Sequence, residues 1–300
     1  MTFQRTAFAL TALVALFGLA ALSAFLRTAT PAGADQALQL QSDGASLAAI
    51  IDVPETVPRP LPAVVLIHGS GRVTAHDMLA NAGRRLTAMG FAVLAYDKRG
   101  VGGSTGEYTS IGPANSDRMF GLLAGDALAG VDALRARKDI DARRIGLVGF
   151  SQAGWIAPLA ASRSPHVAFI VTISGPAVSV GEEIAYSRLA GEDPGSMPGL
   201  TDDEIGRRMA EFSGPHGYDP LPTLRSLTAP SLWILGERDR SIPLRKTVDT
   251  LDRLAGDGKP VTTRVYPGLN HSLRNTVTGE QPDFWRAIEA WLRERRILRP

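Results

Sequence analysis

The sequence predicts an α/β protein built on a doubly wound, mostly parallel sheet. Two observations predict this class. Short apolar runs rich in Val, Ile and Phe recur along the chain, and helical patterns fall between them. Strands that are apolar on both faces are typical of a buried parallel sheet, and the intervening helices supply the layers that cover it.

The first two predicted strands form a hairpin that differs from the rest. Residues 38–41 and 45–53 alternate weakly in polarity and flank the turn sequence Ser42-Asp43-Gly44, so an antiparallel pair is expected. Six more strands are then predicted. They cover residues 63–67, 91–96, 145–150, 167–173, 232–235 and 262–266.

Helical patterns separate most of these strands. They cover residues 76–89, 116–137, 152–162, 244–254 and 282–296. The long interval between the sixth and seventh strands contains no strand pattern, but it holds two capping-box sequences, Ser179-x-x-Glu182 and Thr201-x-x-Glu204. Each capping box predicts the start of a short helix. We therefore expect a helical lid over about residues 175–229, inserted between strands 6 and 7.

Residues 1–34 are predicted to lie outside the folded domain, which spans residues 35–300. Arg5 precedes the uncharged run 7–26, and Ala32-Gly33-Ala34 forms a small-x-small cleavage sequence. These features are typical of an export signal, so a periplasmic or extracellular location is expected. Because an apolar run of this length can also cross a bilayer, retention of residues 7–26 as a membrane anchor stays open.

The composition excludes several kinds of site. The chain has no cysteine, so disulfides, thiol nucleophiles and cysteine–metal sites are ruled out. The net charge is only +2, and the densest basic run, RERR at 293–296, has no interleaved aromatic residues. This argues against a nucleic-acid-binding surface. No His-Glu-x-x-His or comparable spacing indicates a metal site, and the sequence predicts no cofactor.

A serine, an aspartate and a histidine, whose side chains can act together as nucleophile, acid and base, each follow a predicted strand. Ser151 lies in GFSQAG, Asp239 in LGERDRSIP and His271 in NHS. In parallel sheets ligands bind at the edge where the carboxyl ends of the strands meet. A serine hydroxyl needs an imidazole to accept its proton, and the imidazole needs a carboxylate to orient it. We therefore predict a Ser151-Asp239-His271 catalytic triad, with Glu237 as the competing acid.

Acyl transfer by a serine also needs backbone N–H groups that stabilise an oxyanion. We expect one from Gln152, directly after the nucleophile, and one from Ser70 in the HGSG sequence at 68–71, here called the oxyanion loop. The glycine-rich segment 100–106 lacks the spacing of a dinucleotide or phosphate loop. We interpret it as a tight turn near the site, braced by Asp97.

Together these motifs resemble the α/β-hydrolase superfamily. The resemblance covers nearly everything from Ala45 onwards, and it is strongest to exported bacterial esterases and serine-aminopeptidase-like hydrolases. The chain order Ser, Asp, His is the order of that superfamily's triad. One departure is Ala153, where many members have glycine, and we expect the neighbouring Gly154 to absorb the added methyl group.

The resemblance implies a serine hydrolase that cleaves carboxylic esters through an acyl-enzyme, without a cofactor. A serine aminopeptidase or acyl-peptidase acting on a peptide-like substrate is the alternative, and Glu182 and Glu183 are the candidates to bind its amine. Glu182 also fits a simple capping role. A non-catalytic binding protein on the same fold is a second alternative, against which the intact triad argues. Six apolar lid residues are expected to line an acyl pocket: Ile184, Tyr186, Leu189, Ile205, Met209 and Phe212.

Overall fold

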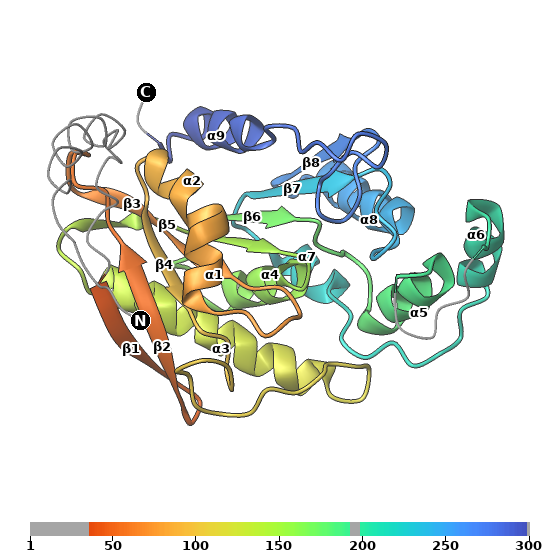
Figure 1. The fold of residues 1–300 in the computed structure, drawn as a ribbon, viewed down its shortest axis with the longest axis horizontal. Coiled ribbons are helices and arrows are strands. Elements are labelled where there is room, and N and C mark those ends of the chain that lie inside the picture. The colour runs from red at the N-terminus through yellow and green to blue at the C-terminus, as the bar shows by residue number, and fades with distance from the viewer. Residues whose placement is uncertain (1–35, 193–198, 299–300) are drawn as a thin grey trace, which may run out of the picture. The chain divides into compact units, whose positions relative to one another are not determined.

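An eight-stranded sheet forms the centre of the protein (Figure 1). The computed structural model describes residues 36–192 and 199–298, so the predicted signal or anchor segment lies outside the described residues. The strands are β1 (Gln36–Ser42), β2 (Ala45–Asp52), β3 (Leu61–Ile67), β4 (Ala92–Tyr96), β5 (Ile140–Phe150), β6 (Phe169–Ile173), β7 (Ser231–Gly236) and β8 (Val261–Tyr266). Their order across the sheet is β1-β2-β4-β3-β5-β6-β7-β8.

The sheet is mostly parallel, which confirms the predicted fold class. β2 is antiparallel to both β1 and β4, and every later pair of neighbours is parallel. Burial follows the sequence pattern: β3, β4, β6 and β7 are buried along their whole length, whereas β2 alternates between buried and partly exposed residues. The strands at the two edges of the sheet are more exposed: β1 and β2 are partly open to water, and β8 has no fully buried residue.

Helices cover both faces of the sheet. They are α1 (Ala75–Met78), α2 (Arg84–Ala88), α3 (Ser116–Arg135), α4 (Ala153–Arg163), α5 (Val180–Ala190), α6 (Asp202–Ala210), α7 (Leu221–Ser226), α8 (Leu244–Gly256) and α9 (Trp285–Glu294). Alternate residues of each strand face opposite layers. Val64 and Leu66 pack with α1, α2 and α9, whereas Val65 and Ile67 pack with α3 and α4.

The predicted helix over 76–89 and the predicted strand over 145–150 differ most from the structure. The helix expected over 76–89 is interrupted by a π-helical stretch, Leu79–Gly83, which joins α1 to α2. β5 begins at Ile140, before the predicted residue 145, because Ile140 pairs with the start of β3 across a register shift. Three of the four residues between these two pairing regions, Asp141, Arg143 and Arg144, are charged, so the sequence does not show an apolar strand there.

The segment between β6 and β7 is helical, and its described residues contain α5, α6 and α7. Ser179 and Glu182 form a reciprocal capping box at the start of α5. Thr201 caps α6 by accepting from the Glu204 backbone N–H. Figure 1 shows α5 and α6 beyond one end of the sheet. That this segment acts as a lid stays a prediction.

The chain order creates a crevice at the centre of the sheet. From β3 the chain crosses to β4 on one side and then to β5 on the other side. Ligands bind outside the carboxyl ends of the strands at such a switch point, and Ser151 directly follows β5 there. In the part of the chain that the structure describes, no helix is long and apolar enough to span a membrane.

Candidate active site

Ser151 occupies a sharp turn between β5 and α4. Its φ angle is 52°, in the left-handed region that residues with a side chain rarely adopt. The turn is fixed by backbone hydrogen bonds: Ser151 N–H donates to the Ile173 carbonyl oxygen at 2.8 Å, and Gly154 N–H donates to the Ser151 carbonyl oxygen at 2.9 Å. A strained strand-to-helix turn of this kind exposes a serine hydroxyl above the sheet.

Gly149 and Gly154, on either side of this turn, each lie so close to a neighbouring residue that a side chain would not fit there. A Cβ atom on Gly149 would lie 2.4 Å from the Cβ of Ala153, and one on Gly154 would lie 2.8 Å from the backbone of Gly175. The expectation that Gly154 absorbs the methyl group of Ala153 is therefore wrong. Gly149 provides that space, and Gly154 instead lets α4 approach the segment after β6.

The structure brings the three predicted triad residues into one hydrogen-bonded chain. His271 Nε2 lies 3.0 Å from Ser151 Oγ, and His271 Nδ1 lies 2.8 Å from Asp239 Oδ2. The Ser174 hydroxyl donates to the His271 carbonyl oxygen at 2.7 Å, which ties the histidine loop to the end of β6. This geometry suits proton transfer from the serine to an imidazole oriented by a carboxylate.

The surroundings distinguish Asp239 from Glu237. Asp239 is 2% exposed, and its Oδ1 accepts hydrogen bonds from the backbone N–H groups of Ser241 at 2.8 Å and Ile242 at 3.1 Å. Glu237 is exposed, and its carboxylate accepts from the Gly268 N–H at 3.0 Å. Of these two acids, Asp239 is the one hydrogen-bonded to the imidazole of His271.

The charge of Asp239 favours the protonated form of His271. Burial by itself lowers the pKa of the imidazole, but the hydrogen bond to Asp239, its negative charge and the more distant charges of Glu183 and Glu192 outweigh that effect. The pKa of His271 is therefore raised above its usual value of 6.5. The group that would accept the serine proton is thus a stronger base than a free histidine.

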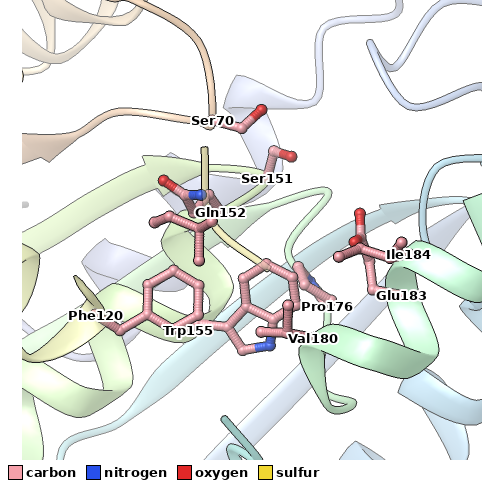
Figure 2. Close-up of a pocket in the computed structure, with 10 residues that line it drawn as sticks. Ser70, Phe120, Ser151, Gln152, Trp155, Pro176, Val180, Glu183 and Ile184 are labelled. Atoms are coloured by element: carbon pink, nitrogen blue, oxygen red, sulfur yellow. The ribbon is translucent and has the colours of Figure 1, made fainter. Parts of the chain in front are cut away.

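Both predicted oxyanion donors lie beside the nucleophile. Ser70 and Gln152 line the same cavity as Ser151 (Figure 2). Within residues 36–192 and 199–298, neither of their backbone N–H groups donates a hydrogen bond to another protein atom. The oxyanion loop touches the turn, since a Cβ atom on Gly69 would lie 3.8 Å from Ser151 Cβ.

The cavity beside Ser151 measures about 90 Å³ and is lined by both polar and apolar residues. Its apolar lining residues are Ile111, Phe120, Trp155, Pro176, Val180 and Ile184. Of the six lid residues expected to line an acyl pocket, only Ile184 does so. The rings of Phe120 and Trp155 stack at 5.1 Å, and the Trp155 indole N–H donates to the Val178 carbonyl oxygen at 2.8 Å. Helices α3 and α4 thus contribute one aromatic side chain each to the wall, and α5 contributes Val180 and Ile184.

The two carboxylates considered for amine binding, Glu182 and Glu183, lie in different surroundings. Glu182 accepts from the Ser179 hydroxyl at 2.7 Å and forms an ion pair with Lys246. It is therefore part of the helix cap and of a contact with α8. Glu183 lines the cavity and lies near the wall formed by Ile184 in Figure 2. One carboxylate, and not a pair, therefore borders the cavity.

Asp97 braces the glycine-rich turn that follows β4. Its Oδ1 accepts from Ala75 N–H at 2.7 Å, and its Oδ2 accepts from Gly103 N–H at 2.7 Å. A Cβ atom on Gly102 would lie 2.1 Å from the same carboxylate, so the turn has no room for a side chain there. These contacts agree with a structural turn.

Comparison with known proteins places this site in a family. The model of the prolyl oligopeptidase family matches residues 82–295, which include all three predicted triad residues. The chain belongs to the prolyl oligopeptidase family. It is therefore a serine hydrolase of the α/β-hydrolase superfamily, as the motifs predict.

The relatives include both peptidases and esterases. The chain is 27% identical to the acylamino-acid-releasing enzyme of Rattus norvegicus over 77% of this chain and 31% of the relative. It is also 27% identical to the esterase EstD of Thermotoga maritima, over 75% of this chain and 58% of the relative. The Pyrococcus horikoshii acylaminoacyl peptidase structure aligns with a TM-score of 0.65 at 19% identity, covering 89% of this chain and 42% of that one. This chain thus spans less than two thirds of each of these proteins.

Proposed function

We propose that this protein hydrolyses carboxylic esters with short, uncharged acyl groups. Ser151 Oγ attacks the ester carbonyl carbon while His271 Nε2 accepts its proton. His271 then protonates the leaving alcohol, which departs to leave an acyl-Ser151 intermediate. Water, deprotonated by His271, attacks the acyl carbon of that intermediate, and the bond to Ser151 Oγ breaks as His271 returns the proton to Oγ and the acid leaves. Asp239 orients the imidazole, and the N–H groups of Ser70 and Gln152 stabilise each oxyanion.

The apolar wall of the cavity beside Ser151 is the observation that carries this proposal. Its walls contain Phe120, Trp155 and Ile184, which offer hydrophobic contact to an acyl chain. A volume of about 90 Å³ leaves room for a short chain rather than a long one. Small acyl groups therefore fill the site, whereas long acyl chains have to extend out of it.

A substrate screen tests the acyl preference and the choice between ester and amide. We expect turnover of p-nitrophenyl acetate and butyrate, with kcat/KM higher than on p-nitrophenyl palmitate. Aminoacyl-p-nitroanilides are expected to be poorer substrates. A preference for the anilides, measured as kcat/KM under the same conditions, would contradict the esterase proposal.

The position of Glu183 in the lining of the cavity favours a second candidate function, that of a serine aminopeptidase. A carboxylate that lines the cavity is positioned to attract a substrate ammonium group. Glu182 supports that function less, because its carboxylate is held by Ser179 and Lys246. The two glutamates therefore form a matched pair of variants that separates amine binding from helix capping.

In the ester hydrolase, Glu183→Gln is expected to change kcat/KM on p-nitrophenyl butyrate by less than about tenfold, since an uncharged acyl group forms no ion pair. In the aminopeptidase, the same change removes the partner of a bound ammonium, worth about 2–5 kcal/mol, so anilide turnover falls by at least about 30-fold. Glu182→Gln is expected instead to lower the free energy of unfolding by about 0.5–2 kcal/mol, measured by urea denaturation.

We also propose that the protein is exported, with residues 1–34 as its signal. The uncharged run 7–26 and the small-x-small sequence before Asp35 support this proposal. The full chain, expressed in a Gram-negative host, is expected in the periplasm with its N-terminus near Asp35, as read by intact mass. Recovery of the complete chain from the membrane fraction would replace cleavage with anchoring, and recovery from the cytoplasm would contradict export.

A further inference from the structure

Lys98 is a buried lysine behind the oxyanion loop, and the triad chemistry above does not use it. Only 4% of its surface is exposed. Its ammonium group donates to the Gly69 carbonyl oxygen at 2.8 Å, to the Ser70 carbonyl oxygen at 3.1 Å and to Gln152 Oε1 at 3.0 Å. An ammonium group has three N–H donors, so each donor has one acceptor here.

The hydrogen bond from Lys98 to the Gly69 carbonyl oxygen affects the predicted oxyanion donor of Ser70. The Gly69 carbonyl and the Ser70 N–H belong to one peptide group, which is trans, so the two bonds point in opposite directions. An ammonium that holds the carbonyl therefore also fixes the direction of the N–H. The positive charge of the Lys98 ammonium next to the Gly69 carbonyl oxygen also polarises this peptide group, which makes the Ser70 N–H a stronger donor.

The third bond reaches the other side of the predicted oxyanion hole. Gln152 supplies the second backbone donor, and its side-chain amide oxygen accepts from Lys98. A single ammonium group thus connects the loop after β3 to the start of α4. The Tyr108 hydroxyl adds a further hydrogen bond to the Ser70 carbonyl oxygen, at 3.0 Å.

We propose that Lys98 is a positioning residue that holds the Ser70 and Gln152 N–H groups at the spacing an oxyanion requires. The proposal rests on the acyl transfer of the proposed function. It does not depend on the choice between ester and amide, because both substrates pass through a tetrahedral oxyanion.

The proton on Lys98 is also held less tightly than usual. Burial lowers the pKa of Lys98 to about 8. The charged or titratable groups that face it are His68, Tyr108, whose ring centre lies 5.5 Å from the ammonium, and Arg72, stacked on the same ring at 4.8 Å. Burial, together with the charge of Lys98, lowers the pKa of His68 to about 3, so that ring is neutral. Deprotonation of Lys98 removes one of its three donors.

The test is Lys98→Met, which keeps the length of the side chain and removes its donors. On p-nitrophenyl acetate we expect kcat to fall about 10- to 100-fold, with KM changed less than about threefold, because the oxyanion exists only in the transition state and intermediate. Lys138→Met is the matched control, since Lys138 is exposed and outside the site. It is expected to keep wild-type kcat and KM.

The pH profile separates positioning from simple structural support. Wild-type kcat/KM, which reports the free enzyme, is expected to fall as the pH rises through about 8, and Lys98→Met is expected to lack that limb. A folded Lys98→Met variant, by circular dichroism, with wild-type kcat overturns the proposal.

If that variant does not fold, Gln152→Met takes its place, because it removes the side-chain acceptor of Lys98 and keeps the backbone N–H of residue 152. A wild-type kcat in that variant overturns the proposal. Should the screen find only anilide turnover, the same comparison is made on the anilide. Failure of the esterase proposal therefore leaves this test intact.

Discussion

Ser151→Ala and His271→Ala are each expected to lower kcat on p-nitrophenyl acetate by about 10³-fold or more. The reason is the 3.0 Å separation between Ser151 Oγ and His271 Nε2, which makes nucleophile and base one proton-transfer unit. Removing either group disables the other. The double variant is therefore expected to have a kcat close to that of the poorer single variant.

His166→Ala is the control for this pair, because His166 is an exposed histidine that follows α4 and lies outside the site. It is expected to keep wild-type kcat. A fluorophosphonate probe is expected to label wild type and the control but not Ser151→Ala, with mass spectrometry locating the adduct on Ser151. Losses that multiply in the double variant would show that the two residues act independently and would contradict the triad.

The central strands could be predicted because burial on both faces leaves a direct mark on the sequence. β3, β4, β6 and β7 are buried along their whole length and mostly apolar, and each ends close to its predicted end. The early part of β5 could not be predicted, since its pairing with β3 is broken by a register shift. The π-helical stretch before α2 likewise leaves no distinct mark on the helical pattern that contains it.

The hydrogen-bonded arrangement of Ser151, Asp239 and His271 could be predicted because each is a polar residue of suitable chemistry just after a strand. The lining of the cavity beside Ser151 could not be predicted, since Phe120 and Trp155 occupy positions that look like ordinary core positions of α3 and α4. Lys98 was missed for a different reason. Its position after β4 gave no sign that its side chain is buried and turned towards the oxyanion loop. The one feature of the sequence that could have indicated a role for Lys98 is its position in the DKRG sequence at 97–100, directly after a predicted strand.

Asp239→Asn is expected to lower kcat by about 10⁴-fold, and the reason lies in the hydrogen bonds of the carboxylate. Oδ1 accepts from two backbone N–H groups, those of Ser241 and Ile242, so the carbonyl oxygen of an asparagine has to occupy that position. Its NH₂ group then faces His271 Nδ1, which has to act as an acceptor. The imidazole proton moves to Nε2, the atom that faces Ser151 and has to accept a proton there. The base is therefore held in the wrong tautomer.

The same substitution has a second consequence, in the acid limb of the pH profile. Hydrolysis needs neutral His271, so activity is present above the pKa of the imidazole and is lost as the pH falls through it. Asp239 raises that pKa, and its replacement by a neutral amide therefore moves the limb of the residual kcat/KM to lower pH. Glu237→Gln is the matched control, because Glu237 is exposed and hydrogen-bonds to Gly268 instead. It is expected to leave both kcat and the position of the limb at their wild-type values. The reverse outcome, an inactive Glu237→Gln beside an active Asp239→Asn, would assign the acid to Glu237 and require the loop after β7 to rearrange during catalysis.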